Sequence, residues 1–372
     1  MVSRWPIRLL SVVLAAWYAR LGMARRARPA EPQRILIAHN LLLGDTIMLA
    51  PLLKKLRTRF PEADIVMTCR PGLVQLFAGR PYGVRVVPFD PRHVDTFWSL
   101  YRERGFDLAL LPMDNRYSWL ARSVDSRWVI AFEGDRPAYK NWPVDELQQL
   151  PDSAMAFGDL LSSNLVDGPA SLPYQVSDWP TPPAPSFEIP TKPYCVLHLG
   201  AGSPLRYWEP GKWIELIAYL EDSDIQPVLS TGPGEAHLVE NVDPKSVLPC
   251  FPGSLSLPQV FRLLSESSAV VCPDTGIAHL ARLVGVPTVV LFGPGSTTMF
   301  GGGEFWRNAP SRNVTIANFP CRNQNIIFRR NLPWSQHCAR TTKQCAAPKC
   351  MEALTFSMVR DAFESMRNEL GF

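Results

Sequence analysis

Short apolar runs alternate with longer amphipathic stretches from residue 34 onward. Four of these runs have the length and apolar character of buried strands, at residues 34–38, 65–67, 108–111 and 128–131. Between the first two, residues 45–60 have a helical pattern that ends at Pro61, and Pro51 either kinks this helix or marks its second turn. Strand, loop, helix and strand in this order form a βαβ unit. We therefore predict a parallel sheet that is covered by helices on both faces.

The same alternation starts again after a proline-rich interruption. Residues 178–193 contain six prolines in 16 positions, so they suit neither a helix nor a central strand, and we interpret them as an interdomain linker. Beyond them we expect strands at 194–198, 227–230, 269–272 and 288–292, and helices at 211–221, 257–266 and 277–284. We therefore predict an α/β protein with two doubly wound, Rossmann-like domains that face each other across a cleft.

The length of 372 residues suits two domains at roughly 100–200 residues each. We predict five parts: a basic N-terminal segment at 1–30, a first domain at 31–177, the linker at 178–193, a nucleotide-binding domain at 194–350, and a C-terminal helical segment at 351–372 that packs back on the body. Hydrophobic residues make up 46% of the chain, which excludes a fully disordered protein. No run approaches the roughly 20 apolar residues of a spanning helix, which excludes a polytopic membrane protein. A net charge of +4 is too small to indicate a nucleic-acid partner.

The N-terminal segment combines basic charge with an apolar stretch. Residues 1–30 contain six arginines and no acidic residue, and residues 9–19 form an uncharged stretch of 11 residues. As a helix this stretch rises about 16 Å, roughly half of a hydrocarbon core. We predict a helix that lies on an anionic membrane surface, with Leu10, Val13, Trp17 and Leu21 facing inward. A signal sequence, a short anchor and a plain extension are the alternatives.

Four glycine-bearing loops follow predicted strands of the second domain, at residues 200–208, 231–235, 272–279 and 292–297. In the third loop Asp274 or Thr275 can cap the following helix, and Gly276 lets a ligand approach the backbone. The exposed amides at that helix start form a natural phosphate site, and His279 lies one turn further along. An ordinary capped helix with a half-buried histidine would have the same sequence.

Two other side chains in these loops have both a functional and a plain interpretation. Arg206 offers a charged fork for a phosphate group, or it is a solvated surface side chain. Glu235 can accept hydrogen bonds from ribose hydroxyls, or it caps its own helix. Because all four loops lie at strand ends of one domain, their combination predicts a nucleotide pocket there.

The first domain has one comparable loop, at residues 39–46, in which Asp45 stands at a helix start. Asp45 is either a capping carboxylate or a general base that points into the cleft. We expect the helix dipole to lower the pKa of Asp45, which would keep it ionised but make it a weaker base.

Four stretches, in chain order, share a known pattern: LLLGDTIMLAPLLKKLRTRFPEADI, HLGAGSPLRYWEPGKW, STGPGE and CPDTGIAHLARLVGVPTVVLFGP. Together they resemble the ADP-heptose–lipopolysaccharide heptosyltransferase family. The resemblance implies the two-domain GT-B fold and a glycosyltransferase that inverts anomeric configuration with no metal and no other cofactor. It also implies a cytoplasmic enzyme, peripheral on the inner face of the inner membrane, that transfers heptose from ADP-heptose to the lipopolysaccharide inner core or another glycan.

The resemblance assigns roles residue by residue. Asp45 matches the proposed base of the family's GD motif, which deprotonates the acceptor hydroxyl as it attacks the anomeric carbon. The donor-binding set is Arg206, Glu235, Asp274, Thr275, Gly276 and His279. The stretch DNRYSWLARSVDSRWVIAFEGD resembles the family's acceptor-side segment, so Arg116 and Arg122 become candidates for binding acceptor phosphates.

Other functions fit the same pocket. A GT-B transferase for a different nucleotide sugar, a nucleotide-sugar epimerase, and a membrane-bound nucleotide-sugar binder without turnover are the alternatives. Asp45 weighs against the last of these.

A cysteine cluster near the C-terminus stands apart from these motifs. Cys321, Cys338, Cys345 and Cys350 are separated by 16, 6 and 4 residues, unlike the paired CxxC motifs of many zinc sites. A metal site with His337 as a substitute ligand, disulfides and free thiols are all compatible with this spacing.

Overall fold

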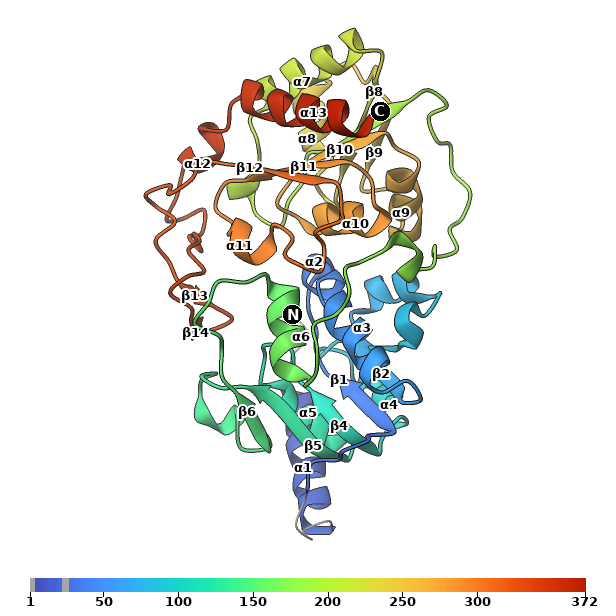
Figure 1. Cartoon of the computed structure of the whole chain (residues 1–372), viewed down its shortest axis with the longest axis vertical. Coiled ribbons are helices and arrows are strands. Elements are labelled where there is room, and N and C mark those ends of the chain that lie inside the picture. Colours follow the sequence, from blue (N-terminus) through green and yellow to red (C-terminus); the bar gives the residue numbers. More distant parts are fainter. Residues whose placement is uncertain (1–3, 22–26) are drawn as a thin grey trace.

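The computed structural model describes residues 4–21 and 27–372, and it has two lobes stacked along the long axis of the molecule (Figure 1). Within these residues, the strands form two six-stranded parallel sheets and one short antiparallel pair, β13 (Ile326–Ile327) with β14 (Arg330–Asn331). The predicted α/β class with two doubly wound sheets is confirmed.

The first sheet has the strand order β3-β2-β1-β4-β5-β6. Its strands are β1 (Arg34–Ile37), β2 (Asp64–Cys69), β3 (Arg85–Pro88), β4 (Phe106–Leu110), β5 (Ser126–Phe132) and β6 (Glu146–Gln148). The helices of this lobe are α1 (Trp5–Leu21), α2 (Leu43–Ile47), α3 (Ala50–Arg59), α4 (Val94–Tyr101), α5 (Tyr117–Ser123) and α6 (Phe157–Leu165).

The second sheet has the order β12-β11-β10-β7-β8-β9, which is the same topology when its strands are counted from β7. Its strands are β7 (Tyr194–His198), β8 (Gln226–Thr231), β9 (Cys250–Pro252), β10 (Ala269–Pro273), β11 (Thr288–Phe292) and β12 (Ser311–Thr315). The helices are α7 (Pro210–Asp222), α8 (His237–Val242), α9 (Leu257–Ser265), α10 (Gly276–Val284), α11 (Thr297–Phe300), α12 (Lys349–Glu352) and α13 (Phe356–Leu370). In both sheets the strand order reverses beside the first strand, and this switch point is where such folds bind ligands.

The predicted strands are all present, and the edge strands β3, β6, β9 and β12 are additional. These edge strands have few buried side chains, so their sequences lack the apolar runs that mark the central strands. The helix predicted at 45–60 is two helices, α2 and α3, with Pro51 in the first turn of α3. Proline is accepted there because the first N–H groups of a helix have no partner inside the helix.

One hydrophobic cluster runs through both lobes. It contains Ile35 and Ile37 of the first sheet together with Val196 and Val270 of the second, and all four are fully buried. Helices α3 and α6 cover this side of the first sheet, and α9 and α10 cover this side of the second. Separate clusters fill the outer faces, under α1, α4 and α5 in the first lobe and under α7, α8 and α13 in the second. The two lobes therefore share a core.

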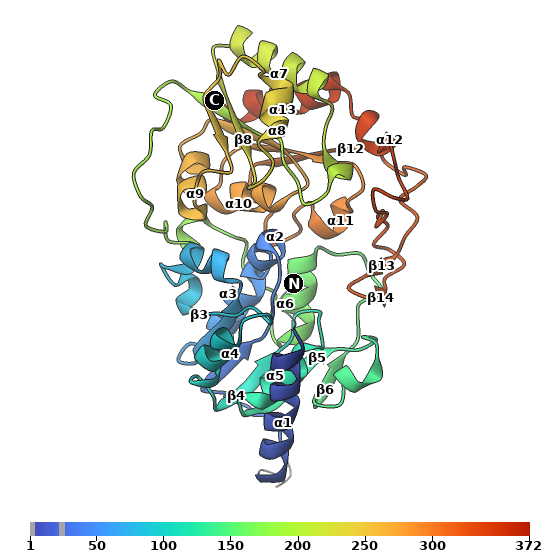
Figure 2. The ribbon, with the colours of Figure 1, turned by 180° about the vertical axis from the view of Figure 1, so that it is seen from behind.

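Helix α1 lies on the outer face of the first lobe and extends to the lower end of the molecule (Figure 2). It packs on α5 through Ile7, Ser11 and Ala15, which are buried. Its opposite face is apolar and exposed, with Trp5, Leu9, Val12, Val13 and Trp17. Of the side chains predicted to face a membrane, Val13 and Trp17 are exposed, whereas Leu10 is partly packed against the lobe. The Leu21 side chain, the Arg20 side chain, and Arg25 and Arg26 lie outside the described part of the structure.

The chain returns from the second lobe to the first after β12. Arg330 of β14 is 3% exposed and donates hydrogen bonds to the backbone oxygens of Met113 at 2.5 Å and Glu133 at 2.6 Å. Trp334 Nε1 donates to the backbone oxygen of Pro151 at 2.9 Å. The segment around β14 therefore packs on the first lobe, and α13 then packs back on α7 and β12.

Candidate active site

Helices α2 and α10 meet where the two switch points face each other. A side chain at Gly44 would place its Cβ 2.7 Å from Cδ2 of His279, and one at Gly276 would lie 3.0 Å from Cδ2 of Leu43. Glycine at both positions is what lets the two helix starts touch. The loop that holds Asp45 and the loop that holds Asp274 are thereby brought together, as the sequence predicts for ligand loops at the cleft.

A cleft pocket lies beside this contact. It is lined from the first lobe by Leu42, Leu43 and Gly44, and from the second by Arg206, Glu235, Thr275, Gly276 and Ile277, with Phe251, Leu255, Leu257 and Val260 on an apolar wall. Arg206, from the short 3-10 helix at Pro204–Arg206, donates through Nη1 to the backbone oxygen of Asp274 at 2.7 Å. Its Nη1 also lies 3.3 Å from Asp274 Oδ2. Asp274 is 4% exposed, so it positions Arg206 from beneath the pocket.

The start of α10 presents open backbone donors to the cleft pocket. Thr275 occupies the N-cap position with extended backbone angles, φ −148° and ψ 170°, and no side chain caps the helix. The side-chain cap that Asp274 or Thr275 could provide is therefore not made. Gly276 and Ile277 line the pocket, and the first N–H groups of a helix have no partner within it. This end of α10 suits an anion such as a diphosphate.

Glu235 is held by three donors at the far side of the cleft pocket. Its carboxylate accepts from the backbone N–H of Gly232 at 2.9 Å, from the backbone N–H of Ala201 at 3.2 Å and from the Tyr207 hydroxyl at 3.0 Å. Helix α8 begins at His237 with Ala236 at its N-cap, so Glu235 does not cap it. A carboxylate offers about four acceptor directions, which leaves one for a ligand hydroxyl.

Asp45 faces the cleft from the first turn of α2. No hydrogen bond joins its carboxylate to the described residues, and α2 has no side-chain cap, so it is not a capping carboxylate. Its pKa is raised to about 6, mainly by burial and also by the nearby charge of Asp274, while Arg206 and Arg70 act in the opposite direction. The predicted lowering by the helix dipole is wrong, because α2 has only five residues and desolvation outweighs its dipole. A carboxylate with this pKa suits general base catalysis near neutral pH.

Several buried polar atoms at this site form no hydrogen bond, although one of them, Asp274 Oδ2, is ion-paired with Arg206. Among the described residues these include His39 Nε2, Asn40 Oδ1, Thr231 Oγ1 and Asp274 Oδ2. All four residues follow, or end, a strand at the cleft edge of its sheet. Since buried polar atoms are nearly always hydrogen-bonded, a polar ligand is the expected partner at this edge.

The comparisons with known proteins agree with this geometry. Residues 170–331, which contain much of the cleft pocket, match the family model described as glycosyltransferase family 9 (heptosyltransferase). Lipopolysaccharide heptosyltransferase 1 of Pseudomonas aeruginosa is 25% identical over 289 residues, 70% of this chain and 79% of that protein. Over residues 170–331 the chain therefore resembles glycosyltransferase family 9.

Solved structures of the family share the whole architecture. A family 9 glycosyltransferase from Veillonella parvula has a TM-score of 0.70 at 16% identity, covering 92% of this chain and 99% of that one. The Escherichia coli heptosyltransferase WaaC with ADP has a TM-score of 0.65 at 17% identity, covering 90% and 99%. The predicted GT-B fold is confirmed.

Arg282 is a buried residue beside the cleft helix contact that the sequence analysis did not single out. It is 2% exposed, lies 3.4 Å through Nη1 from Nδ1 of His279, and donates to the backbone oxygen of Phe300 at 2.9 Å. His279 is buried as well, and desolvation, with Arg282 beside it, lowers its pKa well below the usual value. His279 is therefore a neutral ring that fixes the α2–α10 contact. An arginine within an otherwise apolar helix, three residues after a histidine, was the available signal.

The two arginines expected to bind the acceptor have different surroundings. Arg116, at the N-cap of α5, is half-buried and paired through Nε and Nη2 with Asp114. Arg122 is buried, donates to the backbone oxygens of Pro143, Ser126 and Arg127, and is paired with Asp145. The Arg122 guanidinium thus joins α5 to the strand region of the lobe, and its burial weighs against the predicted contact with an acceptor.

The four C-terminal cysteines line one hollow, together with Arg340 and Lys349. They are free thiols, and Cys338 Sγ accepts from Arg340 Nη1 at 3.3 Å. In the described parts of the chain, no group of three His, Cys, Asp or Glu side chains is arranged to hold a metal ion.

Proposed function

We propose that the chain is an inverting glycosyltransferase that transfers heptose from ADP-heptose to the inner core of lipopolysaccharide. The observation that carries this proposal is the cleft pocket, where a cation, open helix amides and a carboxylate gather close to the half-buried Asp45 of the first lobe. The names of the Pseudomonas relative and of the Escherichia coli structure with ADP support the acceptor and the nucleotide.

In this proposal the nucleotide diphosphate lies at the start of α10. Arg206 and the backbone N–H groups of Gly276 and Ile277 donate to it, with Thr275 beside them. Glu235 accepts from a ribose hydroxyl through its remaining acceptor direction. These donors stabilise the negative charge that grows on the leaving diphosphate, which is the charge that develops in the transition state. Asp274 and His279 position them from beneath the pocket.

Asp45 acts as the general base from the opposite side of the anomeric carbon. It removes the proton of the acceptor hydroxyl as the hydroxyl oxygen forms the new glycosidic bond and the bond to the diphosphate breaks. Attack opposite the leaving group inverts the configuration. With a pKa of about 6, Asp45 is mostly ionised at neutral pH and is still basic enough to accept the proton.

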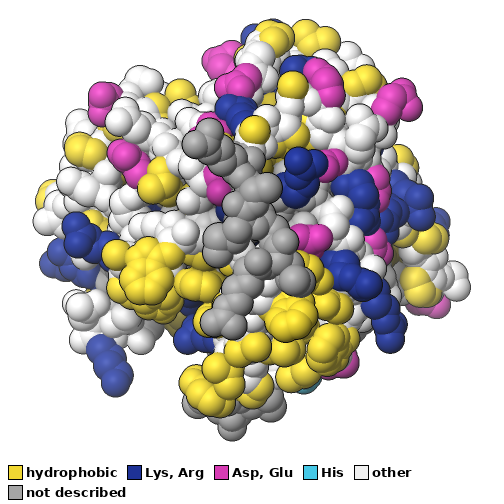
Figure 3. All heavy atoms as spheres, turned by 90° about the horizontal axis from the view of Figure 1, so that it is seen from below, with side chains coloured by type: hydrophobic (Ala, Val, Ile, Leu, Met, Phe, Trp, Pro, Cys, Tyr) yellow, Lys and Arg dark blue, Asp and Glu magenta, His cyan; other side chains and the backbone are white. Residues whose placement is uncertain are grey.

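The acceptor is anchored in a membrane, and we infer that the chain works on the cytoplasmic face of the inner membrane as a peripheral protein. Among the described residues, no helix is long and apolar enough to cross a bilayer. The exposed apolar side of α1, together with Arg4 and Arg8, supports contact with an anionic surface instead. Hydrophobic side chains gather on this face, with Lys and Arg on either side of them (Figure 3).

Thermal stabilisation by ADP, UDP, GDP and CDP tests the donor. A nucleotide at about 100 times its dissociation constant adds roughly 2.7 kcal/mol to the free energy of unfolding, so the correct one gives a clear rise in Tm. We expect ADP alone to do this, and Arg206→Gln to lose most of the effect. Turnover of ADP-heptose with truncated lipopolysaccharide acceptors is the second step. If UDP or GDP stabilises the protein instead, the donor is a different nucleotide sugar and the proposal of heptose transfer is wrong.

A further inference from the structure

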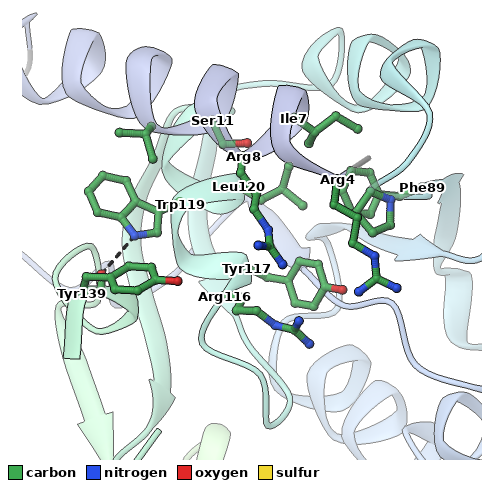
Figure 4. A pocket seen from close by; sticks show the side chains of 12 residues that line it. Arg4, Ile7, Arg8, Ser11, Phe89, Arg116, Tyr117, Trp119, Leu120 and Tyr139 are labelled. Atoms are coloured by element: carbon green, nitrogen blue, oxygen red, sulfur yellow. Dashed lines mark hydrogen bonds between the residues drawn. The ribbon is translucent and has the colours of Figure 1, made fainter. Parts of the chain in front are cut away.

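The first lobe contains a hollow between α1 and α5 that the proposed reaction does not use. We call it the α1–α5 hollow. Arg4, which directly precedes α1, and Arg8 from its first turn line it on one side, and Arg116 and Tyr117 from the start of α5 line it on the other. In Figure 4 the three guanidinium groups gather around the Tyr117 ring. Among the residues that the structure describes, no acidic side chain lines the α1–α5 hollow.

Most of the positive charge in this hollow has no acidic partner among the residues that the structure describes. Arg116 is paired with Asp114, which leaves only its Nη1 atom without a partner. The side chains of Arg4 and Arg8 form no hydrogen bond or ion pair with any residue that the structure describes. Two full charges at the start of α1 therefore face the same space.

Tyr117 adds a neutral donor to this group. Its hydroxyl bonds to no described protein atom, and burial and the charge of Asp114 raise its pKa to about 12, against Arg116 and Arg4. The hydroxyl therefore keeps its proton and can donate it. Several convergent donors with no acceptor among them suit a group with several anionic oxygens, and a phosphate is such a group.

The remaining wall of the hollow is apolar. Ile7, Phe89 and Leu120 form it, and Val12 lines its edge. Val12 also belongs to the exposed apolar side of α1, where Trp5 is 65% and Trp17 59% exposed. The hollow thus opens beside the surface that would lie on a membrane. A ligand that combines a phosphate with hydrocarbon fits both walls.

We propose that the α1–α5 hollow binds the headgroup phosphate of an anionic membrane phospholipid. Arg4 and Arg8 are its main ligands, the Tyr117 hydroxyl and Arg116 Nη1 complete the site, and the start of the acyl chains packs on Ile7 and Val12. The proposal rests on the membrane location proposed above, and on neither the donor sugar nor the reaction.

The position of the hollow gives the bound lipid a role. Arg4 also lines an adjoining hollow with Asn40 and Arg70. Arg70 Nε donates to the backbone oxygen of Asn40 at 3.2 Å, in the loop that leads to α2 and Asp45. A lipid on α1 therefore places the acceptor side of the cleft next to the membrane surface, where a membrane-anchored acceptor is found.

Vesicle binding by the full chain tests the site. We expect binding to phosphatidylcholine vesicles that contain phosphatidylglycerol, and little binding to phosphatidylcholine alone. The double variant Arg4→Gln with Arg8→Gln should lose roughly thirty-fold in affinity or more, since each arginine at an anionic surface contributes about a factor of five. The matched control is Arg102→Gln with Arg127→Gln, which removes the same charge from exposed positions of the same lobe. It should lose only a few-fold.

Equal losses in the two double variants would mean diffuse attraction and would overturn the site. A second measurement uses dihexanoyl-phosphatidylglycerol as a monomer: it should raise the Tm of the wild type but not of the Arg4/Arg8 double variant. No rise in the wild type, or an equal rise with glycerol 3-phosphate, would also overturn the proposal. If the wild type binds no anionic vesicle, the membrane location fails together with the site, whereas nucleotide stabilisation and turnover are unaffected.

Discussion

The two lobes of the molecule hold positive charge in different ways. In the second lobe, the cleft pocket uses backbone amides at the start of α10 and one side chain, Arg206, which an aspartate below holds in place. In the first lobe, the α1–α5 hollow uses guanidinium groups from two helices that are more than a hundred residues apart in the chain. A backbone site is rigid and suits a charge that develops at a fixed point. A site of long side chains adapts to a mobile headgroup.

The largest effect that this comparison predicts is at Asp45, where the two lobes meet. Asp45→Asn should lower kcat by roughly 10²–10⁴-fold, because the amide accepts no proton, while ADP affinity by calorimetry stays the same. In the wild type, kcat/KM should rise as pH increases through about 6, and this dependence should vanish in the variant. Asp95→Asn, at the exposed first turn of α4, is the matched control. Wild-type turnover in Asp45→Asn would exclude it as the base.

Arg206→Gln and Arg116→Gln test whether the two lobes serve different ligands. Arg206→Gln should lower kcat/KM by roughly 10²–10³-fold and weaken ADP binding, because charge on the diphosphate loses its cation. Arg116→Gln should leave ADP binding unchanged. If both variants weaken ADP binding equally in the same titration, the claim that Arg206 and Arg116 bind different ligands is wrong.

The variant Arg122→Met tests whether Arg122 stabilises the first lobe or binds the acceptor. It leaves Asp145 buried without its cation, so we expect the free energy of unfolding to fall by about 3 kcal/mol. The KM for an acceptor should not change below the transition temperature. Urea unfolding and steady-state kinetics on the same preparation measure both, and a raised acceptor KM in a fully folded variant would return Arg122 to the binding site.

Gly44→Ala and Gly276→Ala test the contact between α2 and α10. At Gly44 the new Cβ lies 2.7 Å from a buried ring, whereas at Gly276 it meets the flexible Leu43 side chain at 3.0 Å. Gly44→Ala should therefore displace Asp45 and cost about 10²-fold in kcat, and Gly276→Ala clearly less. If Gly276→Ala lowers the single-turnover rate more than Gly44→Ala does, the packing of Gly44 on His279 does not determine the position of α2.

The smallest predicted effect is on stability and again concerns Asp45. The pKa of Asp45 is about 6 in the folded protein, whereas its ordinary value, which applies to the unfolded chain, is 3.8. Between these pH values the folded state keeps a proton that the unfolded state has lost. Stability therefore falls as pH rises from about 4 to 6, and the cost is complete above 6. Asp45→Asn should raise the free energy of unfolding by on the order of 1–3 kcal/mol at pH 8 and change little at pH 3.5. A stabilisation that is equal at both pH values would contradict this.

The sequence predicts the cleft pocket well because its parts are local. Glycine, proline and a strand ending fix the backbone at residues 272–279 within eight positions, and the resulting amides follow from helix geometry. The strand order then determines where these loops lie, because in both sheets the order reverses beside the first strand and the loops gather at that switch point.

The remaining features depend on contacts between distant segments. Three features can be predicted only when it is known which surfaces meet. They are the desolvation of Asp45, the pairing of Arg122 with Asp145, and the convergence of Arg4 with Arg116. The same reason explains Arg282, whose partners Phe300 and Asn313 follow it by 18 and 31 residues. The arginine within an apolar helix is visible in the sequence, but charge and spacing along the chain do not identify its distant partners.

Arg330 has a consequence for how the molecule unfolds. Its buried guanidinium donates to backbone oxygens of the first lobe, although the residue belongs to the chain that follows the second sheet. Opening either lobe alone would leave those oxygens unsatisfied and would expose part of the shared hydrophobic cluster. The two lobes are therefore one cooperative unit. Calorimetry should show a single transition whose van 't Hoff and calorimetric enthalpies agree, as for a small one-domain protein.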